Sequence, residues 1–251
     1  MKGLTALLKK ELKEQWRTKR IIIVAIVFLF FGFMSPLLIK YLPELLEMAG
    51  DVGLSIPPPT AMQALSEYIS TMVQFGVLVI ILVAMGAVSK ERESGTAALV
   101  LSKPVDYPAF VVAKFLALSL VTLIGIFLGG LACWGYTYLL FGEASVWGFF
   151  LQNILLLLYL WLAVAVTLLF SSIFRSQLAA GALGLVTIVI LTIASSLPWI
   201  GNQLPGELTS WGYRLLSGEA AEAAWGAVAA TLALIVLSLC LAWFILKKKE
   251  I

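Results

Sequence analysis

The chain has 251 residues, of which 61% are hydrophobic and 12% are charged, and its formal net charge is +3. Soluble domains carry roughly 25% charged residues, so this composition excludes an ordinary soluble protein and indicates one whose surface faces lipid. The sequence contains no histidine, which excludes catalysis or metal binding that depends on an imidazole ring.

Long apolar runs make up most of the chain, and they predict an all-α polytopic membrane protein. A helix needs about 20 residues to cross a bilayer, and only helices or closed barrels satisfy their backbone groups there. The runs are continuously apolar, as at 155–161, without the alternation of a barrel strand. We therefore expect a six-span transmembrane domain over 21–246. The predicted spans are 21–39, 68–89, 109–140, 147–170, 178–197 and 225–246.

Residues 1–20 predict an amphipathic helix that precedes the first span. Five large apolar side chains recur at three- and four-residue spacing, and most of the other side chains are charged. A cationic helix with one apolar stripe and a tryptophan suits the membrane surface. A solvated leader is the alternative interpretation. The apolar stripe consists of Leu4, Leu7, Leu8, Leu12 and Trp16.

Three features after the first span predict how the spans are connected and packed. The segment 40–67 is acidic and contains three consecutive prolines, so we expect a loop there. Lys114, near the start of span three, is expected to extend to the interface between lipid and water. Gly125, Gly129 and Cys133 repeat every four residues, a pattern that favours close packing of two membrane helices.

Basic residues are distributed unevenly over the segments between the spans. If the N-terminus is cytoplasmic, six spans leave all but two of the 17 basic residues on the cytoplasmic side. The two exceptions are Lys40 and Arg214. By the positive-inside rule we expect cytoplasmic N- and C-termini, with residues 247–251 as a basic cytoplasmic tail.

The segment 90–108 is the longest polar stretch between two spans that is expected on the cytoplasmic side. Ser94 or Thr96 can cap a short helix over 97–101, and residues 102–104 can end it. Such a helix exposes apolar side chains to water, which favours a protein partner. A loop helix that lies on the lipid explains the spacing equally well.

The order of residues in this segment supports the first interpretation. It reads Glu91-Arg92-Glu93-Ser94-Gly95-Thr96, then Leu99-Val100-Leu101, then Ser102-Lys103-Pro104. This order resembles the loop between the second and third spans of ABC-2 type permeases, the membrane subunits of type V ABC exporters. The amphipathic N-terminal helix and the six spans extend the resemblance over essentially the whole chain, which is most similar to the short prokaryotic members.

The resemblance implies the membrane-spanning permease subunit of an ATP-driven exporter. Residues 1–20 would be a connecting helix along the inner leaflet, and 90–108 would form a coupling helix docked on a separate ATPase subunit. The segment 198–224 would hold short outer helices. The chain would work in a prokaryotic cell (inner) membrane, as a homodimer or with a related permease, together with two ATPase copies. The coupling positions carried over are Glu91, Glu93, Gly95, Thr96, Leu99, Leu101 and Pro104.

The sequence has no GxxxxGK[ST] phosphate loop, so we expect no cofactor in this chain and expect ATP and Mg to be bound by the partner ATPase. We expect neither a metal site nor a nucleic-acid partner. A membrane enzyme of the metal-dependent or aspartyl type is disfavoured, because the sequence has no histidine and no paired acidic residues at lipid depth. A non-transporting assembly or sensor protein that docks a soluble partner on the same loop remains an alternative.

Uncharged polar residues in spans two and five are the candidates for the transport pathway. Polar groups in membrane helices often face the bundle interior, and in the resembled family the route lies along these two spans. Hydrogen bonding between helices is the alternative role for each of them. The candidates are Ser70, Thr71, Gln74, Thr187 and Thr192.

Overall fold

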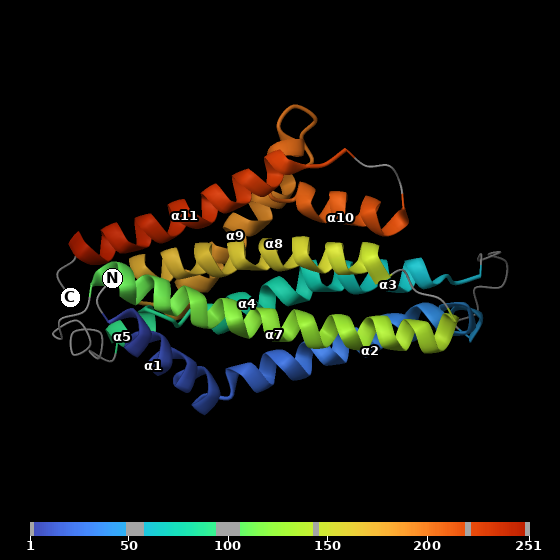
Figure 1. The fold of residues 1–251 in the computed structure, drawn as a ribbon, viewed down its shortest axis with the longest axis horizontal. Coiled ribbons are helices and arrows are strands. Elements are labelled where there is room, and N and C mark those ends of the chain that lie inside the picture. Colours follow the sequence, from blue (N-terminus) through green and yellow to red (C-terminus); the bar gives the residue numbers. More distant parts are fainter. Residues whose placement is uncertain (1–2, 49–57, 94–105, 143–145, 219–221, 249–251) are drawn as a thin grey trace.

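A computed structural model describes residues 3–48, 58–93, 106–142, 146–218 and 222–248. All regular structure in these residues is helical (Figure 1). Six helical stretches are long and apolar enough to cross a bilayer, which confirms the all-α fold and the six spans for this part of the chain. The six stretches are Arg20–Leu46, Ala61–Glu93, Tyr107–Phe141, Val146–Ile173, Gln177–Ala194 and Trp225–Lys248.

Span two is divided into shorter elements, and short helices also precede the first span and the last. The elements in chain order are α1 (Leu4–Arg17), α2 (Arg20–Met48), α3 (Ala61–Thr71), the π-helical turn η1 (Met72–Gly76), α4 (Val77–Ala84), α5 (Ser89–Glu93), α7 (Tyr107–Phe141), α8 (Val146–Ile173), α9 (Gln177–Ala194), the 3-10 turn η2 (Gly201–Gln203), α10 (Glu207–Ser217) and α11 (Trp225–Lys248).

Span one continues well past its predicted end at residue 39. Helix α2 runs to Met48, with Pro36 and Pro43 inside it. Membrane helices tolerate proline because nearby groups can satisfy the backbone carbonyl that loses its partner. The first part of the expected loop over 40–67 is therefore helix.

The end of the same expected loop is also helical, because α3 begins at Ala61. Thr60 and Gln63 form a capping box: the Gln63 backbone N–H donates to Thr60 Oγ1 at 3.3 Å, and the Thr60 N–H donates to Gln63 Oε1 at 3.0 Å. The Thr-x-x-Gln pattern that makes this cap is present in the sequence and marks the true start of the helix. Residues 58–60 are non-helical, as the prolines predict.

The close packing predicted from the glycine repeat is confirmed on α7, where α2 is the neighbour. A Cβ added at Gly125 would lie 2.7 Å from Val24 Cγ1, and one at Gly129 would lie 2.8 Å from the carbonyl oxygen of Phe28. On the facing helix, a Cβ at Gly32 would collide with the carbonyl oxygen of Gly129. Only glycine allows the two backbones to come this close.

The six spans differ in how much of their surface the chain itself covers. Helix α8 is the most enclosed, and it packs against α7, α9, α10 and α11. Helices α9 and α11 are each only 22% buried over their apolar windows, so most of their apolar surface is left for lipid or for another protein. In Figure 1, α1, α5 and the last turns of α11 lie at one end of the bundle, here called the α1 end. The start of α3 and the end of α2 lie at the other, the α3 end.

Candidate functional site

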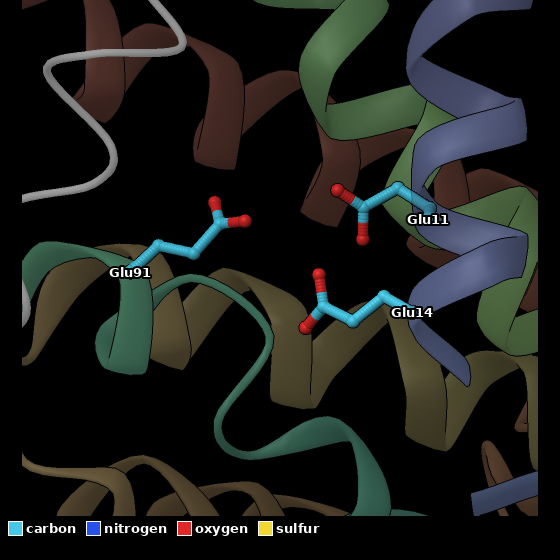
Figure 2. Close-up of side chains that lie close together, drawn as sticks. All are labelled: Glu11, Glu14 and Glu91. Atoms are coloured by element: carbon cyan, nitrogen blue, oxygen red, sulfur yellow. The ribbon is translucent and has the colours of Figure 1, made fainter. Parts of the chain in front are cut away.

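Charged side chains are buried together at the α1 end, where three elements meet. Lys114 of α7 is 2% exposed, Glu11 of α1 is 3% exposed and Glu91 of α5 is 9% exposed. Lys10 and Glu14 of α1 border them. We call these five residues the ionic cluster. Figure 2 shows the carboxylates of Glu11 and Glu14 turned toward that of Glu91, which comes from the other side.

Two ammonium groups hold the three carboxylates of the ionic cluster together. Lys114 Nζ lies 3.1 Å from Glu11 Oε1 and 3.1 Å from Glu91 Oε2, which joins α7 to both α1 and α5. Lys10 Nζ donates to Glu91 Oε1 at 2.5 Å and to Glu11 Oε1 at 3.2 Å. The Lys114 ammonium also lies 4.9 Å from the centre of the Phe110 ring, a cation–π contact.

This arrangement corrects the prediction that Lys114 extends to the interface. The lysine points into the protein because Glu11 and Glu91 arrive there from two other elements and neutralise it. Removing charges from water is costly, and only close pairing with opposite charges offsets that cost. The buried face of α1 also differs from the predicted apolar stripe, because it includes two polar residues. It consists of Leu7, Glu11 and Gln15.

The pKa of Lys10 reflects the same contacts. Partial burial by itself lowers this pKa, but the hydrogen bond and charge of Glu91, together with the charge of Glu11, raise it above its ordinary value of 10.5. Since the folded-state pKa is raised, the stability that Lys10 adds is fully present below pH 10.5 and is lost only as the pH rises through the raised value. At neutral pH the ammonium is charged and the pairing is complete.

The ligand atoms of Glu11, Glu14 and Glu91 all lie within 4.8 Å of one another, close enough to hold a metal ion. Carboxylate oxygens are the ligands that Mg²⁺ and Ca²⁺ prefer. Here, however, the ammonium groups of Lys10 and Lys114 lie 2.5–3.2 Å from the oxygens of Glu11 and Glu91, where a cation would bind. The geometry is that of an ion-paired cluster, and we derive no metal chemistry from it.

A second set of contacts fixes α5 on its other side. Span two breaks into a turn between α4 and α5, and the buried hydroxyl of Ser171 on α8 fills this break. Ser171 Oγ donates to the carbonyl of Met85 at 2.8 Å and accepts from the backbone N–H groups of Val88 and Ser89, each at 3.0 Å. Beyond the break, Arg92 Nη1 donates to the carbonyl of Ser172 at 2.8 Å.

The chain matches a known family of membrane proteins over most of its length. The profile of the family described as ABC-2 family transporter protein matches residues 5–204. The chain belongs to the ABC-2 transporter family. One relative of this ABC-2 protein is the uncharacterized transmembrane protein YxlG of Bacillus subtilis (strain 168), which is 32% identical over 250 residues, covering 97% of each chain. The resemblance to ABC-2 type permeases that the sequence indicated is thereby confirmed. The protein is a multi-pass membrane component of a transport system and not itself catalytic.

The coupling positions expected in this ABC-2 protein are only partly described. Glu91 is a member of the ionic cluster and faces inward, whereas Glu93 is exposed and lines a cavity of about 600 Å³ with Arg92 and Arg175. The remaining coupling positions lie outside the described residues. They are Gly95, Thr96, Leu99, Leu101 and Pro104.

The pathway candidates in span two lie near the α3 end. Gln74 Nε2 donates to Ser70 Oγ at 3.1 Å, and both residues line one cavity. Thr71 Oγ1 lies 3.4 Å from Glu67 Oε1, one helical turn away.

The pathway candidates in span five form hydrogen bonds within their own helix or to a neighbouring helix. Thr187 Oγ1 donates to the Leu183 carbonyl of its own helix at 2.8 Å. Thr192 Oγ1 lies 2.7 Å from the hydroxyl of Tyr159 on α8, which is the helix–helix hydrogen bond named above as the alternative role.

Most of the ionic cluster could not be recognised from the sequence. Lys10, Glu11 and Glu14 are among the charged residues of the predicted amphipathic helix at the membrane surface, and Lys114 was expected to extend to the interface. One signal was available: Lys114 is the only charged residue between Tyr107 and Phe141, and an isolated charge in a membrane helix needs a partner.

Proposed function

We propose that this chain is the membrane-spanning permease subunit of an ATP-driven exporter, and that a separate ATPase subunit docks on the segment 90–108. The observation that supports the proposal best is the ionic cluster. It clamps α5, the helix that leads into this segment, to α1 and α7 by ion pairs of 2.5–3.1 Å. A subunit that pushes or pulls on the segment would therefore act on three elements at once.

Coupling of this kind is a matter of differential binding. Nucleotide bound to the ATPase changes the spans only if it favours one position of the docked segment over another. The described contacts provide a path for this: α5 is joined to α1 and α7 by the ionic cluster and to α8 through Ser171 and Ser172. The cluster transmits the movement, and Glu93, exposed at the same end, is available for direct contact with the ATPase.

The remaining parts of the proposal follow from the family. ATP and Mg are bound by the partner, of which two copies serve two permease chains, identical or related. The chain lies in a prokaryotic inner membrane with cytoplasmic termini, so the α1 end faces the cytoplasm. Among the pathway candidates, Ser70 and Gln74 suit contact with cargo best, because both are exposed and line the same cavity.

The docking proposal is tested with the full-length chain and the ABC ATPase that co-purifies with it, reconstituted in lipid nanodiscs. Glu93→Lys combined with Gly95→Pro should leave the amount of folded permease unchanged and lower both ATPase capture and ATP hydrolysis severalfold. Glu222→Lys reverses an exposed charge outside the 90–108 segment and is the matched control, expected to have no effect. Wild-type ATP hydrolysis in the doubly substituted complex would rule out docking on this segment. Capture of the ATPase without any movement of cargo would favour the assembly or sensor alternative.

The orientation is tested separately, by cysteine labelling in a variant that lacks Cys133 and Cys240. Single cysteines at Lys13, exposed on α1, and at Gln63, exposed on α3, should react with impermeant maleimide from opposite sides of the membrane. Lys13 should react only after the cells are opened. Labelling of Lys13 in intact cells would reverse the predicted topology.

A further inference from the structure

A cavity lined by several polar side chains lies at the α3 end, away from the ionic cluster. Its volume is about 580 Å³, and it is an open hollow bordered by α3, η1, α8 and α10. This size falls within the range of roughly 300–1,000 Å³ that is typical of small-molecule sites. Most of the residues that line it carry polar groups, although apolar atoms make up more of the lining surface. The polar residues include Ser66, Ser70, Gln74, Gln152, Thr209 and Arg214.

Gln152 of α8 is the residue that points to a ligand. Its side chain is 1% exposed and lines the cavity, yet its Oε1 has no hydrogen-bond partner among the described residues. Ser66 Oγ, in the same wall, is also buried without a partner there. Buried polar atoms are nearly always paired, because leaving one unpaired costs stability. Two such atoms in one wall therefore indicate a place where a bound molecule completes the hydrogen bonds.

The backbone around the cavity packs closely against the Gln152 side chain. A Cβ at Gly212 of α10 would lie 2.9 Å from Gln152 Cδ, so glycine is what lets α10 pack directly against the side chain. On the opposite wall, Val73 and Gln74 belong to the π-helical turn η1. Single π-helical turns inside membrane or soluble helices are frequent at functional sites.

The charge of the cavity decides the class of ligand. Among the described residues that line it, Arg214 is the only charged one, and Arg214 Nη2 already donates to Glu207 Oε1. The cavity therefore offers no unpaired charge to an ion, while Ile69 and Val73 give it an apolar side. We infer that the cavity binds an amphipathic molecule with an uncharged, hydrogen-bonding head group, held by Gln152 and Ser66. Only the identification of this molecule as cargo depends on the proposed function; the binding itself requires no ATPase.

The test measures binding to the full-length protein alone, in nanodiscs, by native mass spectrometry. The probes are three amphiphiles with the same chain length: monolauroylglycerol, which is neutral, dodecanoate and dodecyltrimethylammonium. We expect saturable binding of monolauroylglycerol in preference to both ions. Gln152→Leu should weaken this binding about tenfold, as the loss of one buried hydrogen bond does. Asn153→Leu, at the neighbouring carboxamide, should not, because Asn153 lines a separate cavity between α7 and α8.

A second variant keeps the test independent of the stability of Gln152→Leu. Ser70 is exposed at the edge of the cavity, so Ser70→Trp should obstruct the cavity and abolish binding while the chain still elutes as a folded species. Stronger binding of either ion, equal binding by Gln152→Leu and the wild type, or occupancy by water alone would overturn the inference. Loss of ATPase coupling would leave these results unchanged, so the two proposals can fail separately.

Discussion

Replacing Lys114 by methionine tests the ionic cluster most directly, because methionine keeps most of the volume of the side chain and removes its charge. In the wild type, Lys114 Nζ lies 3.1 Å from both Glu11 and Glu91. In the variant, these two carboxylates are still buried, and Lys10 alone remains to neutralise them. Removing one partner from a buried ion pair costs about 3–5 kcal/mol, since the remaining charge stays out of water.

For a chain of this size, each kilocalorie lowers the unfolding temperature by about 2–4 °C, so Lys114→Met should lower it by about 10 °C. The assay follows tryptophan fluorescence of the full-length protein during heating in nanodiscs. The control is Lys13→Met on the exposed side of α1, which should change the stability by less than about 0.5 kcal/mol.

A double-mutant cycle separates charge pairing from loss of packing. Glu91→Gln removes one of the carboxylate charges that Lys114→Met leaves unpaired, so the combined variant should be more stable than the sum of the single effects, by about 2 kcal/mol. Additive effects, or a Lys114→Met variant as stable as Lys13→Met, would refute the reasoning. Either result would mean that the three elements are held together by apolar packing and not by charge.

Two further substitutions test the contacts between the spans, and each has a control substitution of the same residue type. Ser171→Ala removes the hydroxyl that hydrogen-bonds three backbone groups at the break in span two. It should lower the free energy of unfolding by about 3 kcal/mol in the same heating assay. Ser172→Ala removes only a hydrogen bond to the Leu168 carbonyl of its own helix and should lower it by about 1 kcal/mol or less. Equal effects of the two serines would show that the break does not depend on Ser171. Gly32→Ala should separate α2 from α7 and cost about 2 kcal/mol or more, because its Cβ would collide with the Gly129 carbonyl. Gly135→Ala, whose Cβ would meet nothing within 4 Å, should be neutral or slightly stabilising, and a harmless Gly32→Ala would contradict the close approach.

The sequence by itself determined the membrane-spanning architecture. A run of about 20 apolar residues has few alternatives to a bilayer helix, so the six spans could be recognised without knowing how they pack. The repeat of Gly125, Gly129 and Cys133 also sufficed to find the packing face of α7, because only small residues permit such an approach. Helix ends were harder to place: α2 passes through two prolines that would have ended a helix in a soluble protein.

Only the tertiary structure decided what the charged residues do. Glu11 and Lys114 are 103 positions apart, and nothing in the local pattern of either helix indicates that they meet. Whether a charge in a helix extends to water or turns inward depends on whether an opposite charge from another element comes within about 3 Å of it. The same is true of Ser171, which serves a break in a different span. The periodicity and length of an apolar run are local properties that can be read directly from the sequence. The pairing of buried polar groups arises only when distant segments pack together.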